Sequence, residues 1–208
     1  MIINPVILEK YGAKPVLYKK GEILFREGCE PTHFYQVASG VVKMNNFNEE
    51  GTEFIQGMFR EGESFGEPPL FGDFKYPSNA EAVTESVLWK IPKENFLNLL
   101  KDNFDLHLKF CSILSQRLQF KAMIAKEIST NTPEHRILTL IEYFQKKSSK
   151  AANCPFFEVP FTRQQIADMT GLRVETVIRT IKALTKENKL QIINRKVFYP
   201  AEKELAGH

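Results

Sequence analysis

The run from Thr162 to Leu184, TRQQIADMTGLRVETVIRTIKAL, has the spacing of two helices joined by a glycine turn. Thr162 is placed to cap the first helix, and Gln165, three residues later, completes a capping box. Gly171 supplies the backbone freedom that the turn needs, and Leu172 is expected to fill the corner. Apolar residues at helical spacing form the inward faces: Ile166, Ala167 and Met169 in the first helix, and Val177, Ile181 and Leu184 in the second. The run therefore predicts a helix-turn-helix unit.

The polar residues of the second helix are left pointing outward. They are Arg173, Glu175, Thr176, Arg179 and Lys182. A helix held in this way can lie in the major groove of DNA, where arginine pairs with guanine and glutamate accepts from cytosine. The alternative is an ordinary helical hairpin with a solvated charged face. The flanking segments LQII and KVFY, around Asn194 and Arg195, predict a two-stranded wing and favour DNA binding.

The charge of the chain is unevenly distributed. The 208 residues have a net charge of +3 and a hydrophobic share of 43%, which is typical of one or two globular domains. Residues 150–208 contain ten Lys and Arg against six Asp and Glu, a net charge of +4, whereas residues 1–149 contain eighteen against nineteen, a net charge of −1. The positive excess lies beside the predicted reading helix, as attraction to the phosphates of double-stranded DNA requires.

Several patterns are missing from the sequence. It has no P-loop, no GxGxxG turn, no nucleophile elbow and no HExxH pair, so no enzyme is predicted. No apolar stretch approaches the roughly 20 residues of a membrane span, and the first residues lack a signal-peptide pattern, so a cytoplasmic protein without a membrane partner is expected. Cys29, Cys111 and Cys154 form neither a disulfide framework nor a metal motif, and we interpret them as structural thiols.

The first part of the chain, from about Tyr18 to Pro92, is rich in short β-type runs. These runs are ILF, FYQVASGVVKM, FIQGMF and VLWKI, and glycines punctuate them. Many short strands with glycine turns predict a sandwich or a barrel-like roll.

The next stretch, residues 103–129, lacks proline and glycine and repeats apolar residues at three- and four-residue steps. It predicts one long helix. Its apolar seam is too long to be covered by one small roll, so a second copy of the helix is the expected cover, giving a homodimer. The residues assigned to this dimer helix are Leu108, Cys111, Leu114, Leu118, Ala122 and Ala125. The alternative is that the seam packs only on its own domain.

A break in the pattern follows at residues 129–133. Thr132 suits an N-cap with Pro133 at the first helical position, which opens a helix through about Lys147. Residues 148–153 then predict a polar loop. The expected domains are therefore a sensor domain with the long helix, residues 1–130, and a winged helix-turn-helix domain, residues 131–208.

The motifs KGEILFREG, VASGVVKM, GESFGE and TRQQIADMTGLRVETVIR, in this order, resemble the Crp/Fnr family of bacterial transcription regulators. The resemblance spans nearly the whole chain. It implies an α+β architecture with an N-terminal β-roll (jelly roll) of the cyclic-nucleotide-binding type, a long dimerisation helix and a C-terminal winged helix-turn-helix. It also implies a dimeric regulator that binds a palindromic DNA site and works with RNA polymerase.

The resemblance assigns roles to residues of the predicted helix-turn-helix unit, Thr162 to Leu184, which we call the reading unit. Arg163 and Gln164 would lie at the DNA phosphates, and Glu175, Thr176 and Arg179 would lie at the groove. Thr162, at the start of the first helix, is counted among the DNA-binding residues. The chain departs from the family where Arg173 and Val174 replace a hydroxyl cap followed by arginine. Val174 offers a thymine-methyl contact instead, so the base preference of relatives does not carry over.

The effector pocket matches the family only in part. Phe65, Gly66 and Glu67 correspond to the FGE motif that holds the ribose in nucleotide-binding members. The prolines that follow, Pro68 and Pro69, lack the N–H groups that a phosphate needs.

The other pocket positions also depart from the family. Tyr76, Pro77 and Ser78 stand where an arginine is expected, and Lys121 and Ala122 replace hydroxyl residues on the long helix. A buried phosphate without a paired cation is costly. The sequence therefore predicts that the roll does not bind cAMP in the family manner.

Other sensor chemistries have little support. Residues 1–28 contain no cysteine, which argues against the iron–sulfur cluster of some members, and His33, His107 and His135 are haem-ligand candidates by residue type alone. No cofactor or metal is predicted, and the effector stays unidentified. The alternative function is a ligand-sensing or protein-interaction module whose winged domain no longer binds DNA.

Overall fold

The computed structural model describes residues 1–130, 132–148 and 155–200. The chain forms two compact units, residues 1–119 and 120–208, and the division falls within helix α4 (Phe104–Thr130). The domain boundary expected at residue 131 follows the end of that same helix. The expected loop at 148–153 and Cys154 lie almost entirely outside the described residues. Each unit is described by itself.

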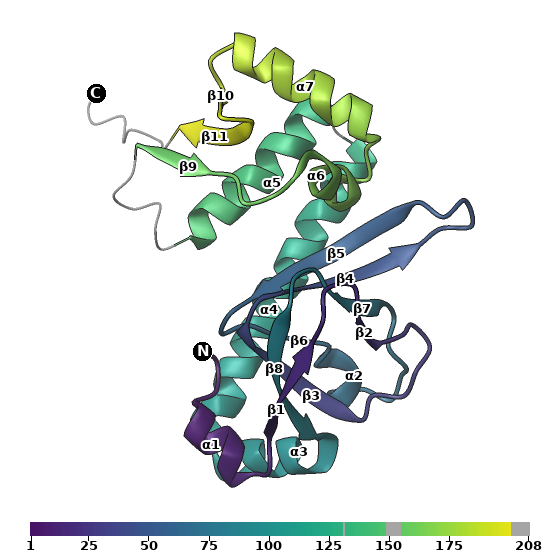
Figure 1. Cartoon of the computed structure of the whole chain (residues 1–208), viewed down its shortest axis with the longest axis vertical. Helices are drawn as coiled ribbons and strands as arrows, with labels where there is room; N and C mark the ends of the chain where they lie inside the picture. The colour runs from purple at the N-terminus through teal and green to yellow at the C-terminus, as the bar shows by residue number, and fades with distance from the viewer. Residues whose placement is uncertain (131, 149–154, 201–208) are drawn as a thin grey trace. The chain divides into compact units, whose positions relative to one another are not determined.

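The first unit contains a roll of two antiparallel four-stranded sheets (Figure 1). One sheet has the order β1 (Lys14–Tyr18), β8 (Ser86–Pro92), β3 (His33–Ser39), β6 (Ser64–Phe65). The other has the order β2 (Ile23–Phe25), β7 (Asn79–Ala82), β4 (Val41–Phe47), β5 (Glu53–Arg60). The predicted β-roll and the α+β class are thus confirmed.

Glycine divides the longest predicted β-run into two strands. Gly40 has φ +89° between β3 and β4, and a Cβ there would lie 2.3 Å from Ser86 Oγ and 2.5 Å from the carbonyl oxygen of Glu85. Only glycine accepts this backbone and this close approach. The sequence patterns did not predict β1, β6 or β7, because these strands are short or carry no alternation of apolar residues.

The space between the two sheets is filled largely by aromatic side chains. The buried residues of this inner core are Tyr18, Phe25, Tyr35, Val37, Val42, Phe65, Tyr76, Ala80, Ala82 and Leu88. Phe25 and Tyr76 stack with ring centroids 3.7 Å apart, and Tyr35 stacks on Phe65 at 5.6 Å. Offset aromatic pairs of this kind stabilise a core beyond the area they bury.

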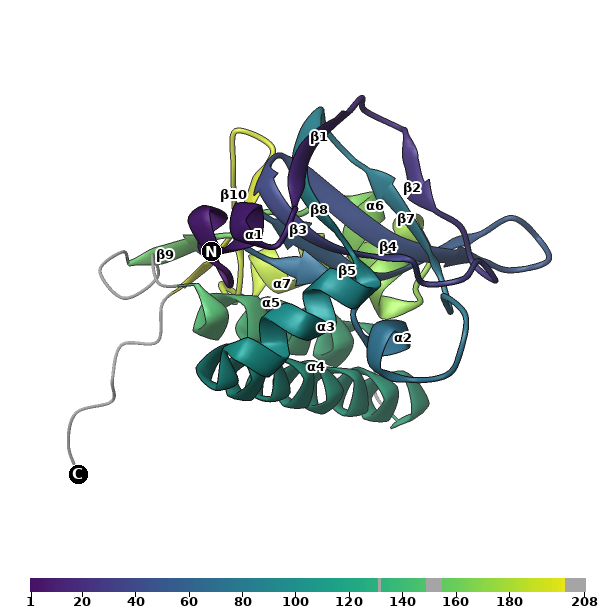
Figure 2. The same ribbon diagram turned by 90° about the horizontal axis from the view of Figure 1, so that it is seen from below.

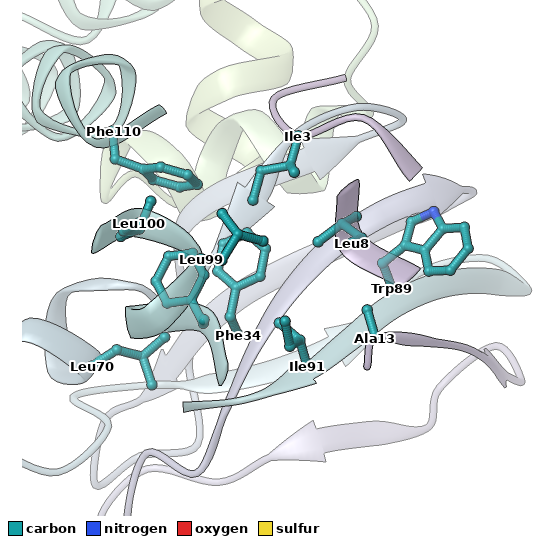
Figure 3. Packing of buried hydrophobic residues seen from close by; sticks show 11 residues of the cluster. Ile3, Leu8, Ala13, Phe34, Leu70, Trp89, Ile91, Leu99, Leu100 and Phe110 are labelled. Carbon is teal, nitrogen blue, oxygen red and sulfur yellow. The ribbon is translucent and has the colours of Figure 1, made fainter. Parts of the chain in front are cut away.

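A second core lies on the other face of the β1–β8–β3 strands, which Figure 2 shows side by side. Helices α1 (Pro5–Lys10), α3 (Lys93–Asp102) and the first turns of α4 cover this face. Figure 3 shows the side chains that meet there, among them Phe34, Leu99 and Phe110. Neither α1 nor α3 was predicted from the sequence.

Helix α4 has two stripes of residues with the same heptad spacing and opposite exposure. One stripe is buried or half-buried in the chain: Leu106, Phe110, Ile113, Arg117, Phe120, Ile124 and Glu127. The other stripe is exposed: Phe104, Leu108, Cys111, Ser115, Leu118, Ala122 and Ala125. Phe104 and Leu118 are 68% and 69% exposed. Because 3.5 residues make nearly one turn, each stripe keeps to one side of the helix.

The second unit combines three further helices with a three-stranded antiparallel sheet. The helices are α5 (Pro133–Lys147), α6 (Arg163–Thr170) and α7 (Val174–Lys186). The sheet has the order β10 (Gln191–Ile193), β11 (Lys196–Pro200), β9 (Phe156–Glu158). Thr132 caps α5 with Pro133 in its first turn, as predicted. Within the described ranges, no helix is long and apolar enough to cross a membrane.

Candidate DNA-binding surface and effector pocket

The first helix of the predicted reading unit begins with a complete capping box. The Thr162 hydroxyl accepts from the backbone N–H of Gln165 at 3.1 Å, and the Gln165 side chain accepts from the N–H of Thr162 at 3.0 Å. The helix ends at Gly171, whose φ of +65° is left-handed. Leu172 is half-buried after it. The predicted cap and turn are confirmed, and together they fix where α7 starts.

Helix α7 buries its apolar side and exposes a charged side. Val177, Ile181 and Leu184 are buried at 1% exposure or less, as predicted. Arg173 occupies the N-cap position without a capping bond, also as predicted.

The residues predicted to reach DNA from α7 lie on its outer side. Arg173, Glu175, Arg179 and Lys182 are exposed, and Thr176 is half-buried. None of these four charged side chains forms an ion pair with any residue that the structure describes. Glu175, Arg179 and Lys182 line a hollow on the helix surface together with Ile178. Two arginines and a lysine are therefore available to an anionic partner.

The DNA-binding residues predicted at the start of α6 are engaged within the unit. The Thr162 hydroxyl serves the cap, and Gln164 donates from Nε2 to Asp168 Oδ1 at 2.7 Å. Arg163 donates from Nη1 to the carbonyl oxygen of Arg195 at 2.8 Å. This bond ties the start of α6 to the turn between β10 and β11. No local pattern predicts this bond, because the two residues are far apart in the chain.

The predicted wing is a two-residue hairpin. Strands β10 and β11 pair in register from Gln191 with Phe198 to Ile193 with Lys196. Asn194 and Arg195 form the turn with φ of +49° and +67°. Positive φ at both turn positions matches the twist of a tight hairpin, and asparagine is a common residue there. The wing is confirmed.

The glutamate of the FGE motif is already paired inside the roll. Glu67 is fully buried, and Arg117 of α4 approaches its Oε2 with Nη1 at 2.6 Å. The Ser64 hydroxyl donates to the other carboxylate oxygen, and Arg117 also donates to the Ser64 carbonyl. The Arg117 guanidinium lies 5.2 Å from the ring centre of Phe59. Arg117 was not predicted as the partner of Glu67, because a cation was expected close to the FGE motif in the sequence, and Arg117 is distant from it in the chain.

Tyr76, one of the three residues in the neighbourhood of the family's arginine, belongs to the inner core. Tyr76 is 3% exposed, lies against Phe25 and donates its hydroxyl to the carbonyl oxygen of His33 at 3.3 Å. Burial raises the pKa of the Tyr76 hydroxyl, so it stays neutral. A Cβ on Gly66 would lie 3.0 Å from Phe25 and 3.3 Å from Tyr76. Phe65, also predicted as a pocket residue, is fully buried among the same rings.

The remaining predicted pocket residues are dispersed. Pro68 is exposed at the start of the short helix α2 (Pro68–Phe71), and Ser78 is fully buried, with no partner for its hydroxyl among the described residues. The nearby cation, Lys75, faces Glu30 at 3.5 Å on the surface. Lys121 and Ala122 belong to the second unit and are exposed.

Five of the six residues predicted for the dimer helix lie in its exposed stripe. Leu114 is instead half-buried, and the exposed stripe contains Ser115, which the apolar pattern did not reveal. Ser115 therefore occupies the heptad position at which the apolar pattern had predicted Leu114. Cys29 and Cys111, which we interpreted as structural thiols, are free and exposed in the single chain.

The histidines considered as haem ligands each have a different neighbour. His33 is half-buried with Nδ1 2.9 Å from the Thr32 hydroxyl, His107 stacks edge-on against Phe104, and His135 lies 3.1 Å from Glu127. Across the described ranges, no three His, Cys, Asp or Glu residues group in a way that could hold a metal ion.

Comparison with known proteins follows the same division of the chain. The model of the cyclic nucleotide-binding domain matches residues 15–103, and the model of the Crp-like helix-turn-helix domain matches residues 135–206. The fumarate and nitrate reduction regulatory protein of Escherichia coli strain K12 is 27% identical over 199 residues, which cover 94% of this chain and 78% of the relative. The same regulator of Yersinia pestis is 27% identical over 180 residues, covering 86% of this chain and 71% of the relative.

Solved structures share the fold over almost the full length. The c-di-GMP responsive global regulator CLP of Xanthomonas campestris has a TM-score of 0.77 at 21% identity, covering 96% of this chain and all of the other. FixK2 of Bradyrhizobium japonicum has a TM-score of 0.77 at 19% identity, covering 92% and 94%.

The fold, the capped reading unit and these matches define a transcription regulator with a DNA-binding helix-turn-helix domain and an effector-type roll, and not an enzyme. The chain belongs to the Crp/Fnr family.

Proposed function

We propose that the protein regulates transcription as a homodimer that binds a palindromic DNA site and responds to an effector other than cAMP. The observation that carries the proposal is the outer side of α7, where Arg173, Arg179 and Lys182 are exposed and unpaired within the described residues. The capping box and the left-handed Gly171 hold this helix in a defined place. A rigid helix with exposed arginines suits base reading in the major groove.

The exposed stripe of α4 supports the dimer. It repeats at heptad spacing from Phe104 to Ala125, and large apolar side chains such as Leu118 stay uncovered in the single chain. A second α4, related by a twofold axis, buries the same stripe on both copies. Two reading helices then meet half-sites about one helical turn apart on the duplex, which is why the site is expected to be palindromic.

The roll interior argues against cAMP as the effector. In nucleotide-binding relatives the motif glutamate takes a ribose hydroxyl and an arginine takes the phosphate. Here Glu67 is bonded to Arg117 and Ser64, and Tyr76, one of the three residues near the family's arginine position, is a neutral ring packed on Phe25. A phosphate placed there loses its hydration without gaining a cation. The same fold serves a c-di-GMP responsive regulator in Xanthomonas campestris, so the roll is not tied to one ligand.

The proposal extends to location and partner. A regulator of this kind acts on the chromosome in the cytoplasm and contacts RNA polymerase there. Two large apolar side chains near the motif glutamate, Phe71 and Phe74, are 43% and 48% exposed, but nothing in the described residues assigns them to the polymerase. The polymerase contact therefore stays a prediction from the family.

The test is selection of bound sequences from a random DNA library by the purified full-length protein, with and without cell extract. We expect a twofold-symmetric consensus whose affinity falls steeply with salt, because each neutralised phosphate releases counterions. A dependence on extract would reveal an effector. Recovery of no consensus in either condition would contradict the proposal and favour the alternative, a docking module whose winged domain has lost DNA binding.

A further inference from the structure

The outer side of α7 contains one large apolar side chain among charged ones. Ile178 is 41% exposed, whereas the other isoleucine of the helix, Ile181, is 1% exposed. Ile178 lines the same surface hollow as Glu175, Arg179 and Lys182. Glu175 and Lys182 are three residues before and four residues after it, so all of these side chains share one helix face.

The chemistry of this position selects its partner on DNA. A branched alkyl group neither donates nor accepts a hydrogen bond, so it gains nothing from the polar atoms of a base edge. Thymine alone presents an apolar group in the major groove, its C5 methyl. Cytosine has only hydrogen at C5, so it offers isoleucine no methyl group to contact.

We propose that Ile178 is a specificity-determining residue that contacts the C5 methyl of a thymine in each half-site. This inference rests on the proposed function, since it requires that α7 reads the major groove. The thymine lies next to the base pairs that Glu175 and Arg179 reach, because the three side chains leave the helix from adjacent positions. Val174 was the residue predicted for such a contact, but Val174 is half-buried and Ile178 is the more exposed of the two.

The experiment starts from the consensus that the full-length protein selects. Each thymine of one half-site is replaced in turn by deoxyuridine, which removes the methyl group and keeps the base pairing. At one thymine we expect the dissociation constant to rise about fourfold, the ratio that corresponds to burying one methyl-sized group. The Ile178→Ala variant should bind the thymine and deoxyuridine sites equally at that position, which is the non-additivity of a direct contact.

The matched control is Ile193→Ala, which shortens an isoleucine that is 48% exposed in the wing of the same unit. This variant should keep the fourfold preference for thymine. The proposal is overturned if every deoxyuridine site binds as well as its parent, if Ile178→Ala keeps the preference, or if the selected half-site has no thymine. A failure to bind DNA is distinguishable from these outcomes, because the protein would then bind no unmodified consensus at all. That outcome would overturn both the proposed function and the Ile178 contact.

Discussion

The Arg117 guanidinium lies 2.6 Å from the fully buried carboxylate of Glu67. This ion pair joins the FGE motif of the β-roll to helix α4. The Arg117 side chain is itself 26% exposed. In nucleotide-binding relatives the matching glutamate meets a ligand. In this chain the Arg117 guanidinium takes the place of the ligand. The FGE motif is retained, but its Glu67 carboxylate is already paired within the protein.

Removing Arg117 should destabilise the first unit. The Arg117→Met variant leaves a buried carboxylate with the Ser64 hydroxyl alone, which we expect to cost about 3–5 kcal/mol of unfolding free energy. Urea unfolding followed by the fluorescence of Trp89 measures it, because Trp89 is the single tryptophan and lies in the core of this unit. Lys101→Met, which removes an exposed cation from helix α3 of the same unit, should cost at most about 1 kcal/mol. If the double variant Glu67→Gln, Arg117→Met were no more stable than Arg117→Met, the ion pair would not explain the loss.

Cyclic AMP should not bind with high affinity. Titration calorimetry of the purified protein should give no saturable heat, because Glu67 is engaged and Tyr76, Pro77 and Ser78 stand where the family has an arginine for the phosphate. A ligand that binds the folded state also raises the melting temperature, so a thermal scan with millimolar cAMP provides an independent check. Tight binding of one cAMP for each chain would refute our account of the roll.

Cys111 should report on the dimer. Two α4 helices paired through the exposed stripe bring the partner thiols face to face at the same heptad position, with Cα atoms in the range of about 4.4–6.8 Å that a disulfide spans. A variant that keeps only Cys111 should form a covalent dimer on mild oxidation, seen on a non-reducing gel. The matched variant that keeps only Cys29, also exposed, should not. Leu118→Glu should abolish both the cross-link and the dimer in gel filtration, and a cross-link that survived it would argue against this stripe.

Arg179 should contribute to base-specific binding. The Arg179→Ala variant is expected to weaken binding to the selected consensus by about 1–3 kcal/mol and to relax selectivity at one base pair. Lys182→Ala, on the same face, should weaken binding to all sequences alike and lower the salt slope by about one. Gel shifts at several salt concentrations distinguish the base-specific loss of Arg179→Ala from the sequence-independent loss of Lys182→Ala. An unchanged shift for Arg179→Ala would remove this residue from the reading surface.

Gly40 should be far less tolerant of a side chain than Gly51. Both have left-handed φ, +89° and +76°, but a Cβ on Gly40 meets Ser86 and Glu85 within 2.7 Å, whereas nothing lies within 4 Å of one on Gly51. We expect Gly51→Ala to cost about 1–2 kcal/mol from the backbone alone. Gly40→Ala should cost clearly more, measured by Trp89 fluorescence in urea. Equal losses for both variants would show that the β3–β4 turn relaxes around the added methyl group.

Local patterns of the sequence predicted the reading unit almost completely. Thr162 and Gln165 form a capping box because both partners lie within one turn, and Gly171 takes the left-handed conformation that the turn needs. The wing turn at Asn194 and Arg195 is of the same kind. The roll and the long helix also follow from strand, glycine and heptad patterns. In each case the interacting residues are close in the chain, so spacing alone carries the information.

The sequence alone therefore determined the order of the β-roll, the long helix and the winged helix-turn-helix, the family, and the charged outer side of α7. Only the tertiary structure decided that Arg117 neutralises Glu67, that Arg163 holds the wing turn, and that Ile178 is the exposed apolar residue of the reading face. Two of these are contacts between residues distant in the chain, and the third is a degree of exposure. Both depend on how elements pack in space, and no local period of the sequence encodes that packing.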